Sequence, residues 1–197
     1  MSPQEFKNLW FDSDGPLSPI SLERLNRFSM LSSTISFLTK AGLPKNAAPN
    51  LSFANDSNDI VYGINKLTEQ YDFSKDSDKY DKYVVIGSCR DGDAIAINTT
   101  EQDIIVELDH EDLFSSTFFN SSIETLADFL IIYRDFESSV LMEHGEKGYR
   151  NSCFSDIQFE DLKTKMLKSD RRALTEKGFW KDELEIIIEL KQQYMNS

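Results

Sequence analysis

The sequence has few of the residues with which enzymes and metalloproteins build their sites. Its 197 residues include two histidines, His110 and His144, and two cysteines, Cys89 and Cys153. Neither histidine has a partner at the spacing of a metal site or a catalytic pair, and no glycine-rich phosphate loop or nucleophile elbow occurs. We therefore expect a chain that is not an enzyme, with no catalytic, cofactor-binding or metal-binding residues.

Long apolar runs are also missing, and so is a disulfide framework. No segment approaches the ~20 apolar residues that a membrane-spanning helix needs. The stretch from Met1 to Trp10 lacks the basic region and apolar core of a secretion signal. A single possible cysteine pair suits a reducing compartment better than an oxidising one. These absences predict a cytoplasmic protein that does not bind membranes.

Several short aspartate clusters are present, but ordinary turns and hydrated loops explain them. The segment Asp12–Gly15 resembles the opening of a calcium loop, yet its glycine comes too early and no bidentate glutamate closes it. Asp91 and Asp93 flank a glycine and suit a tight turn. Cys89 is interpreted as a small buried apolar residue.

The strongest compositional signal is negative charge. The formal net charge is -13 and the sequence pI is about 4.6, while 40% of the residues are hydrophobic and 12% aromatic. Such a chain can fold as one packed domain over residues 1–197. Its field repels nucleic acids and anionic lipids and attracts basic proteins. Many soluble proteins are acidic simply because charge keeps them dispersed, so charge alone leaves both interpretations open.

Apolar periodicity places helices at both ends of the chain. Residues 1–30 are interpreted as an N-terminal helical extension, and the helical pattern continues from Leu22 to Ala41. Gly42 and Pro44 then end it. Another helix is expected from Asn120, with Ser121 as its cap and Glu124 completing a capping box. The remaining helical segments are an irregular extension or connection over 137–152, a helix around 157–166, and a terminal helix at 182–194 whose apolar face we expect to belong to the core.

The middle of the chain alternates like an antiparallel sheet. Strands are expected at Tyr83–Gly87, Ala94–Asn98 and Ile104–Leu108, and weaker ones at Leu51–Phe53 and Ile60–Ile64. Turns at 90–93 and 99–102 join the stronger strands, and 69–82 is expected to be an exposed loop or a long connection. The fold class is therefore α+β: a central, mostly antiparallel sheet flanked by N-terminal and C-terminal helices.

Acidic side chains crowd the last of these strands, and three phenylalanines follow them. A wet sheet rim and a protein-binding face both fit this pattern, because charge steers an encounter and aromatic side chains anchor it. Phe114, Phe118 and Phe119 are more often core than interface. The possible partner-binding residues are Glu101, Asp103, Glu107, Asp109, Glu111 and Asp112.

The order of these parts resembles the SUKH superfamily, which includes bacterial immunity proteins and fungal cell-wall synthesis regulators. The resemblance rests on the helix end at 37–44, the strands around 85–87 and 94–98, and the helix opening at 120–123. The tail supports it, since Asp170–Ala173 followed by Gly178–Trp180 and an amphipathic helix is similar to the ending of one immunity branch.

The resemblance implies a non-catalytic protein that binds and neutralises a cognate polymorphic toxin, many of which are nucleases. One alternative is a regulatory or scaffold module that binds cellular proteins. Another is an enzyme of an unrecognised type, against which the absence of catalytic constellations argues. Either partner is expected to be a basic protein and not a nucleic acid. Immunity surfaces vary with their toxins, so no binding residue carries over from the family, and the oligomeric state stays open.

Overall fold

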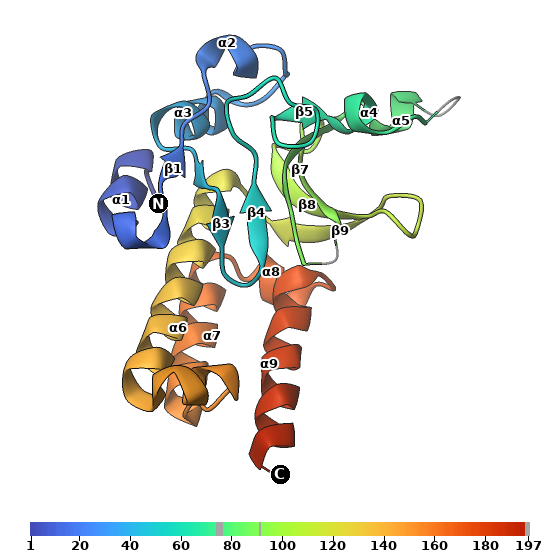
Figure 1. Cartoon of the computed structure of the whole chain (residues 1–197). Helices are drawn as coiled ribbons and strands as arrows, with labels where there is room; N and C mark the ends of the chain where they lie inside the picture. Colours follow the sequence, from blue (N-terminus) through green and yellow to red (C-terminus); the bar gives the residue numbers. More distant parts are fainter. Residues whose placement is uncertain (74–76, 91, 196–197) are drawn as a thin grey trace.

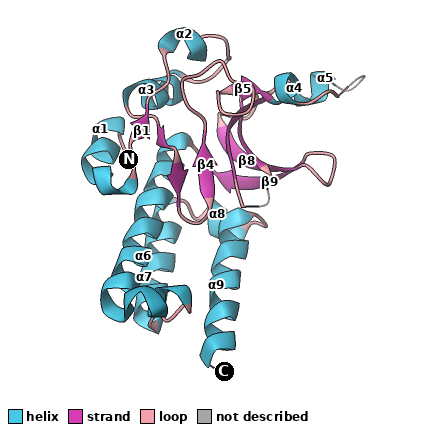
Figure 2. Ribbon diagram, in the orientation of Figure 1, coloured by secondary structure: helices cyan, strands magenta, loops and turns pink. Residues whose placement is uncertain are grey.

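The chain forms an antiparallel sheet with most of its helices gathered on one face (Figures 1 and 2). The computed structural model describes residues 1–73, 77–90 and 92–195. The strands are β1 (Leu17–Ser18), β2 (Leu43–Pro44), β3 (Asn46–Ala47), β4 (Leu51–Phe53), β5 (Asn65–Lys66), β6 (Tyr83–Ser88), β7 (Ala94–Asn98), β8 (Ile104–Asp109) and β9 (Ser115–Asn120). The helices are α1 (Pro3–Leu9), α2 (Leu22–Leu25), α3 (Ser32–Lys40), α4 (Leu67–Gln70), α5 (Ser77–Tyr80), α6 (Ile123–Arg150), α7 (Asp156–Ser169), α8 (Arg172–Thr175) and α9 (Phe179–Met195), with a short 3-10 turn at Asp12–Asp14.

The main sheet confirms the predicted antiparallel meander. Its strands follow the order β3-β4-β6-β7-β8-β9, and β5 pairs with the opposite end of β6. All of these pairings are antiparallel. The strands expected at 51–53, 83–87, 94–98 and 104–108 are all present. Strands β1 and β2 form a separate two-stranded sheet.

The central strands are buried on both faces, as their continuous apolar runs predicted. In β7, Ile95 and Ile97 join the main core beneath the helices, whereas Ala94 and Ala96 face a second cluster. That second cluster is closed by Leu67 of α4, by Tyr80 of α5 and by neighbouring aromatic rings. Alternation along a strand sends successive side chains to opposite faces, so one short run contributes to both clusters.

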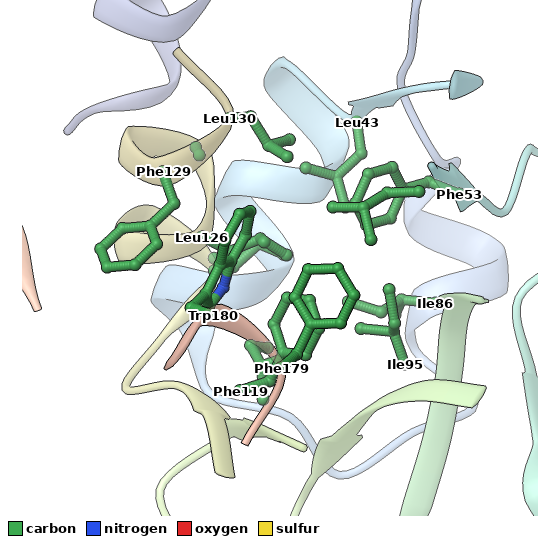
Figure 3. Close-up of a cluster of buried hydrophobic side chains, with 14 of the residues drawn as sticks. Leu43, Phe53, Ile86, Ile95, Phe119, Leu126, Phe129, Leu130, Phe179 and Trp180 are labelled. Atoms are coloured by element: carbon green, nitrogen blue, oxygen red, sulfur yellow. The ribbon is translucent and has the colours of Figure 1, made fainter. Parts of the chain in front are cut away.

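Aromatic side chains from β9, α6 and α9 pack together at the centre of the main core (Figure 3). Trp180 is fully buried, and its ring lies 5.1 Å from that of Phe129 and 5.4 Å from that of Phe119. Its indole Nε1 donates to Asn120 Oδ1 at 3.0 Å, so the polar edge of the ring is satisfied inside the core. Phe118 and Phe119 are buried and Phe114 is half-buried, in agreement with the prediction that they are core residues.

The helical region predicted from Leu22 to Ala41 consists of two helices, α2 and α3, and not one. The end of α3 matches the prediction. Gly42 has a φ of 68°, and a Cβ at this position would overlap the carbonyl oxygen of Ser18 on the neighbouring strand. Glycine is therefore required here, both for the positive φ and for the close approach of β1.

Three segments differ from the sequence prediction. Residues 60–64 form a turn with one isolated bridge and not a strand, because Asp59 and Asn65 bind the backbone around it. The expected loop at 69–82 contains the short helix α5 and the end of α4; residues 74–76 lie outside the described part. Strand β9 was missed, because its Ser-Ser-Thr opening is typical of a loop.

In the predicted 90–93 turn, Gly92 has a φ of 84°, and Asp91 lies outside the described residues.

The N-cap of helix α6 lies one residue later than predicted. Ser122 is its N-cap, and Thr125 completes the reciprocal arrangement predicted for Ser121 and Glu124. Ser121 instead donates through its backbone N and its Oγ to the buried carboxylate of Asp170, at 2.6 and 2.9 Å. The irregular extension predicted for 137–152 is a continuation of α6 through a kink at Gly145, which has a φ of 66°.

Helix α9 is core at its beginning and exposed at its end. Leu184 and Ile187 are buried, as predicted, but Tyr194 is 48% exposed and Leu190 is 38% exposed. The prediction that the whole apolar face belongs to the core is therefore right for the first half of the helix and wrong for the second.

Candidate partner-binding surfaces

The structure does not bring the six acidic residues around β8 onto one surface. Asp103 is only 2% exposed, and its Oδ2 accepts a hydrogen bond from the backbone N of Leu31 at 2.6 Å, just before α3. Glu107 is half-buried in the middle of β8. These two carboxylates are committed to the interior of the protein.

Glu107 lies in a polar group that spans three segments. The thiol of Cys89 donates to its Oε1 at 3.1 Å, and Thr117 Oγ1 donates to its Oε2 at 3.2 Å. Burial raises the pKa of Glu107, and the nearby charge of Asp93 adds to this effect. Cys89 is buried, as predicted, but it also serves as a hydrogen-bond donor.

Cys89, Asp93 and Glu107 could in principle hold a metal ion, because one ligand atom of each lies within 4.8 Å of the others. Hydrogen bonds within the protein already use these atoms. Asp93 Oδ1 accepts from the backbone N of His110 at 2.9 Å and contacts its ring Nδ1 at 2.6 Å, which raises the pKa of the imidazole. Three ligands of this mixture do not complete the tetrahedral set of a structural zinc site. We assign no metal here.

The other four acidic residues reach the surface at the two ends of β8. Glu101 is exposed in the turn before the strand. Glu111 and Asp112 are exposed in the β8–β9 hairpin, and Asp109 accepts from the backbone N of both, at 2.9 and 3.0 Å. Beside them Leu113 is 79% exposed. We call Asp109, Glu111, Asp112 and Leu113 the acidic hairpin; it projects from the sheet on the right of Figure 1.

A second surface feature is an open cleft of about 980 Å³ between α6, the start of α9 and the β3–β4 turn. Figure 1 shows the β3–β4 hairpin pointing between these two helices. The lining residues come from distant parts of the sequence, from Trp10 to Glu183. The charged residues that line the cleft in the described part of the chain are Asp14, Arg90, Arg134, Glu137 and Glu183.

Among the described residues that line the cleft, two of the three carboxylates each form a salt bridge with an arginine. Glu183 is 4% exposed, forms a salt bridge with Arg90 and accepts from the Tyr133 hydroxyl at 2.7 Å. Arg134 binds Asp14 at 3.2 Å. Its guanidinium also donates to a backbone carbonyl at 2.7 Å and lies 5.6 Å from the centroid of the Trp10 ring. Both arginines are therefore already engaged by groups of the protein itself.

Glu137 is the third carboxylate, and its partner is neutral. Its Oε1 accepts from the hydroxyl of Tyr149 at 2.6 Å. Among the described residues, no lysine, arginine or histidine nitrogen lies within 4.0 Å of it. Burial raises the pKa of Glu137, and the charge of Glu183 raises it further. The hydrogen bond to Glu137 in turn adds to the burial that raises the pKa of Tyr149.

Sequence reasoning could not have found this cleft. Glu137 belongs to a segment with no motif, and Tyr149 follows the kink at Gly145, which brings it back toward the helix. No spacing rule connects these positions with Arg90 or Glu183. The acidic hairpin, by contrast, is local in sequence, so its charges could be recognised directly.

Comparison with known proteins identifies the family. No described helix is long and apolar enough to cross a membrane. No curated protein and no solved structure matches the chain. The family model described as SUKH-4 immunity protein matches residues 17–186, which include the whole main sheet and the helices from α2 to α8. The chain therefore belongs to the SUKH-4 immunity protein family, which is part of the SUKH superfamily that its sequence resembles.

Proposed function

We propose that this chain is a cytoplasmic, non-catalytic immunity protein that neutralises a basic, nuclease-type toxin by placing its acidic hairpin over the groove that binds nucleic acid. Family membership supports the immunity role. The hairpin carries the mechanism: three carboxylates and a large exposed apolar side chain lie within five consecutive residues, 109–113. A nuclease holds phosphates with basic side chains, and a cluster of carboxylates can occupy the same groove.

The arrangement of the hairpin suits this role. Asp109 accepts from two backbone N–H groups of the turn, so the carboxylates of Glu111 and Asp112 are displayed on a held backbone. A preorganised loop loses less conformational entropy when it binds. Leu113 lies beside the charges and supplies the apolar anchor that a charged surface alone lacks. Glu101, at the opposite end of β8, is expected to contribute to steering and not to direct contact.

The cytoplasmic assignment has separate support. Neither Cys89 nor Cys153 is in a disulfide, and Cys153 is exposed. Free thiols of this kind suit a reducing compartment. In the same proposal the whole chain acts as one domain, in which residues 1–30 are an N-terminal extension; Phe6 of α1 is fully buried against the main core.

The test is stopped-flow binding to the toxin domain encoded beside the chain, or to one captured by pull-down. The triple variant Asp109→Asn, Glu111→Gln, Asp112→Asn removes three charges, and the asparagine side chain introduced at position 109 can still accept from the turn. We expect the association rate constant to fall about three- to tenfold at low salt. Leu113→Ala should mainly speed dissociation, by about tenfold.

A matched control removes three charges at exposed positions of α6 and α7. It is the triple variant Glu143→Gln, Glu146→Gln, Glu160→Gln. Equal association rates for the two triple variants would refute the acidic-hairpin mechanism, even if the toxin is neutralised. A scaffold protein, the alternative function, would bind a cellular protein and would give no protection when the toxin domain is expressed in the same cell.

A further inference from the structure

The cleft between α6, α9 and the β3–β4 turn contains a carboxylate that forms no salt bridge with any residue in the described part of the chain. Of the charged groups that line it, Glu183 pairs with Arg90, and Asp14 pairs with Arg134. Glu137 is left with the hydroxyl of Tyr149. A half-buried carboxylate with a neutral partner is costly, because a hydroxyl offsets less of the lost hydration than a cation does.

Tyr149 contacts Glu137 as arginines contact Glu183 and Asp14, but with a neutral hydroxyl. It lies beyond the kink at Gly145, is 40% exposed, and reaches back twelve residues to place its hydroxyl on Glu137 Oε1. The hydroxyl can leave Glu137 and bind water, since the ring is at the surface. In the neighbouring Glu183, Oε2 pairs with Arg90 and Oε1 accepts from the Tyr133 hydroxyl, so the two carboxylates are not equivalent.

We propose that this cleft is a binding site for an arginine side chain carried on an extended segment of a protein partner, with its guanidinium donating to the carboxylate of Glu137. The planar guanidinium can donate two hydrogen bonds to one carboxylate, which a lysine ammonium cannot do in the same geometry. The cleft is at the upper end of the ~300–1,000 Å³ range of ligand pockets, which leaves room for the backbone that carries the side chain. The ring of Tyr149, which is 40% exposed, supplies aromatic surface beside Glu137.

The inference is independent of the acidic hairpin, which projects from the sheet elsewhere on the molecule. It can therefore be tested without the toxin. The probe is Nα-acetyl-L-argininamide, titrated into the full chain and followed by NMR chemical shifts. Its neutral isostere, Nα-acetyl-L-citrullinamide, is the control ligand. We expect saturable arginine binding that moves the resonances of residues 137 and 149, and no saturation with the citrulline compound.

Three variants complete the test. Glu137→Gln keeps an acceptor for Tyr149 but removes the charge, and should weaken arginine binding by about tenfold or more. Tyr149→Phe removes the competing hydroxyl and should tighten it. Glu146→Gln, on the same helix but exposed, should leave it unchanged. Equal binding of the two ligands, or equal arginine affinity of Glu137→Gln and the native chain, would overturn the proposal, as would the absence of saturable binding.

Discussion

Two carboxylates in the turn between β7 and β8 have opposite surroundings. Asp103 is buried and accepts from Leu31 N, whereas Glu101 is exposed and lies 4.0 Å from Lys82. Removal of the Asp103 carboxylate would leave a backbone donor without its partner, so Asp103→Ala should lower the free energy of unfolding by about 1–3 kcal/mol. Glu101→Ala should change it by about 0.5 kcal/mol or less. Urea denaturation of both variants measures the difference.

Asparagine at position 103 provides the control for this prediction. Its Oδ1 can accept from Leu31 N, and asparagine tolerates the φ of 56° at this position. Asp103→Asn should therefore lose less stability than Asp103→Ala. If all three variants were equally stable, the contact with Leu31 would not contribute to folding.

Glu137 makes a prediction about pH. Because burial raises its pKa, the folded chain binds this proton more tightly than the unfolded chain does. The stability linked to the group is therefore present below its ordinary pKa of 4.5 and is lost as pH rises through the folded pKa. Glu137→Gln, which is neutral at every pH, should be more stable than the native chain at pH 7, and the difference should shrink toward about pH 4. Thermal unfolding across a pH series tests this sign.

The stability gain separates a binding role from a structural one. If the carboxylate of Glu137 stabilised the folded state, its replacement would lower stability, and Glu137→Gln would melt at a lower temperature than the native chain. A carboxylate whose role is to bind a partner is expected to reduce the stability of the free protein. Glu146→Gln should show little pH-dependent difference from the native chain, since its side chain is 85% exposed.

At the scale of elements, the two halves of α9 should differ in importance. A chain that ends after Gly178 loses Trp180, Leu184 and Ile187, each worth about 1.5–3 kcal/mol on full burial. We expect it to be insoluble or to lack a cooperative transition, since a typical domain has ~5–15 kcal/mol of net stability. A chain that ends after Glu189 loses exposed apolar groups and the Lys191–Asp156 pair, whose aspartate is 96% exposed. It should unfold cooperatively with little loss of stability, because an exposed ion pair contributes little. Circular dichroism melts of both chains test the contrast.

The same elements show how far sequence reasoning reaches. Strand β7 matches its predicted range because Ala-Ile-Ala-Ile is apolar throughout and is bounded by turn residues. Strand β9 escaped because its first residues are polar and exposed, and its pairing with β8 supplies the order that its sequence does not signal. At 60–64 the error ran the other way: β-branched residues indicated a strand, but side-chain bonds from Asp59 and Asn65 hold a turn.

For surfaces too, local features can be predicted from the sequence, and features that depend on distant segments cannot. The charges of the acidic hairpin were visible in the sequence because all three carboxylates lie within residues 109–112. The burial of Asp103 and Glu107 could not be seen in the sequence, because it depends on contacts with distant segments. Asp103 accepts from Leu31 N, and Glu107 accepts from Cys89 and Thr117. The cleft depends wholly on tertiary structure, because its wall combines segments that are far apart in sequence. These are Trp10 just after α1, the β3–β4 hairpin, α6 and the start of α9.

At the scale of the whole molecule, the net charge of -13 should act on association from a distance. Long-range attraction depends on the summed field, whereas short-range contacts depend on the hairpin. The triple hairpin variant still carries ten of the thirteen net negative charges. Its association with a basic toxin should therefore keep a salt dependence that is shallower than that of the native chain but not absent.

We expect the native association rate constant to fall by about tenfold or more between low salt and about 0.5 M, as the screening length shortens from ~10 Å at 0.1 M. The dissociation rate constant should change little, because the anchor at Leu113 is apolar and does not respond to screening in this way. Stopped-flow measurements over a salt series give both constants for the native chain, the hairpin variant and the control variant. If salt acted only on dissociation, the field would have no part in the encounter, and contacts formed after docking would have to account for the selection of a basic partner.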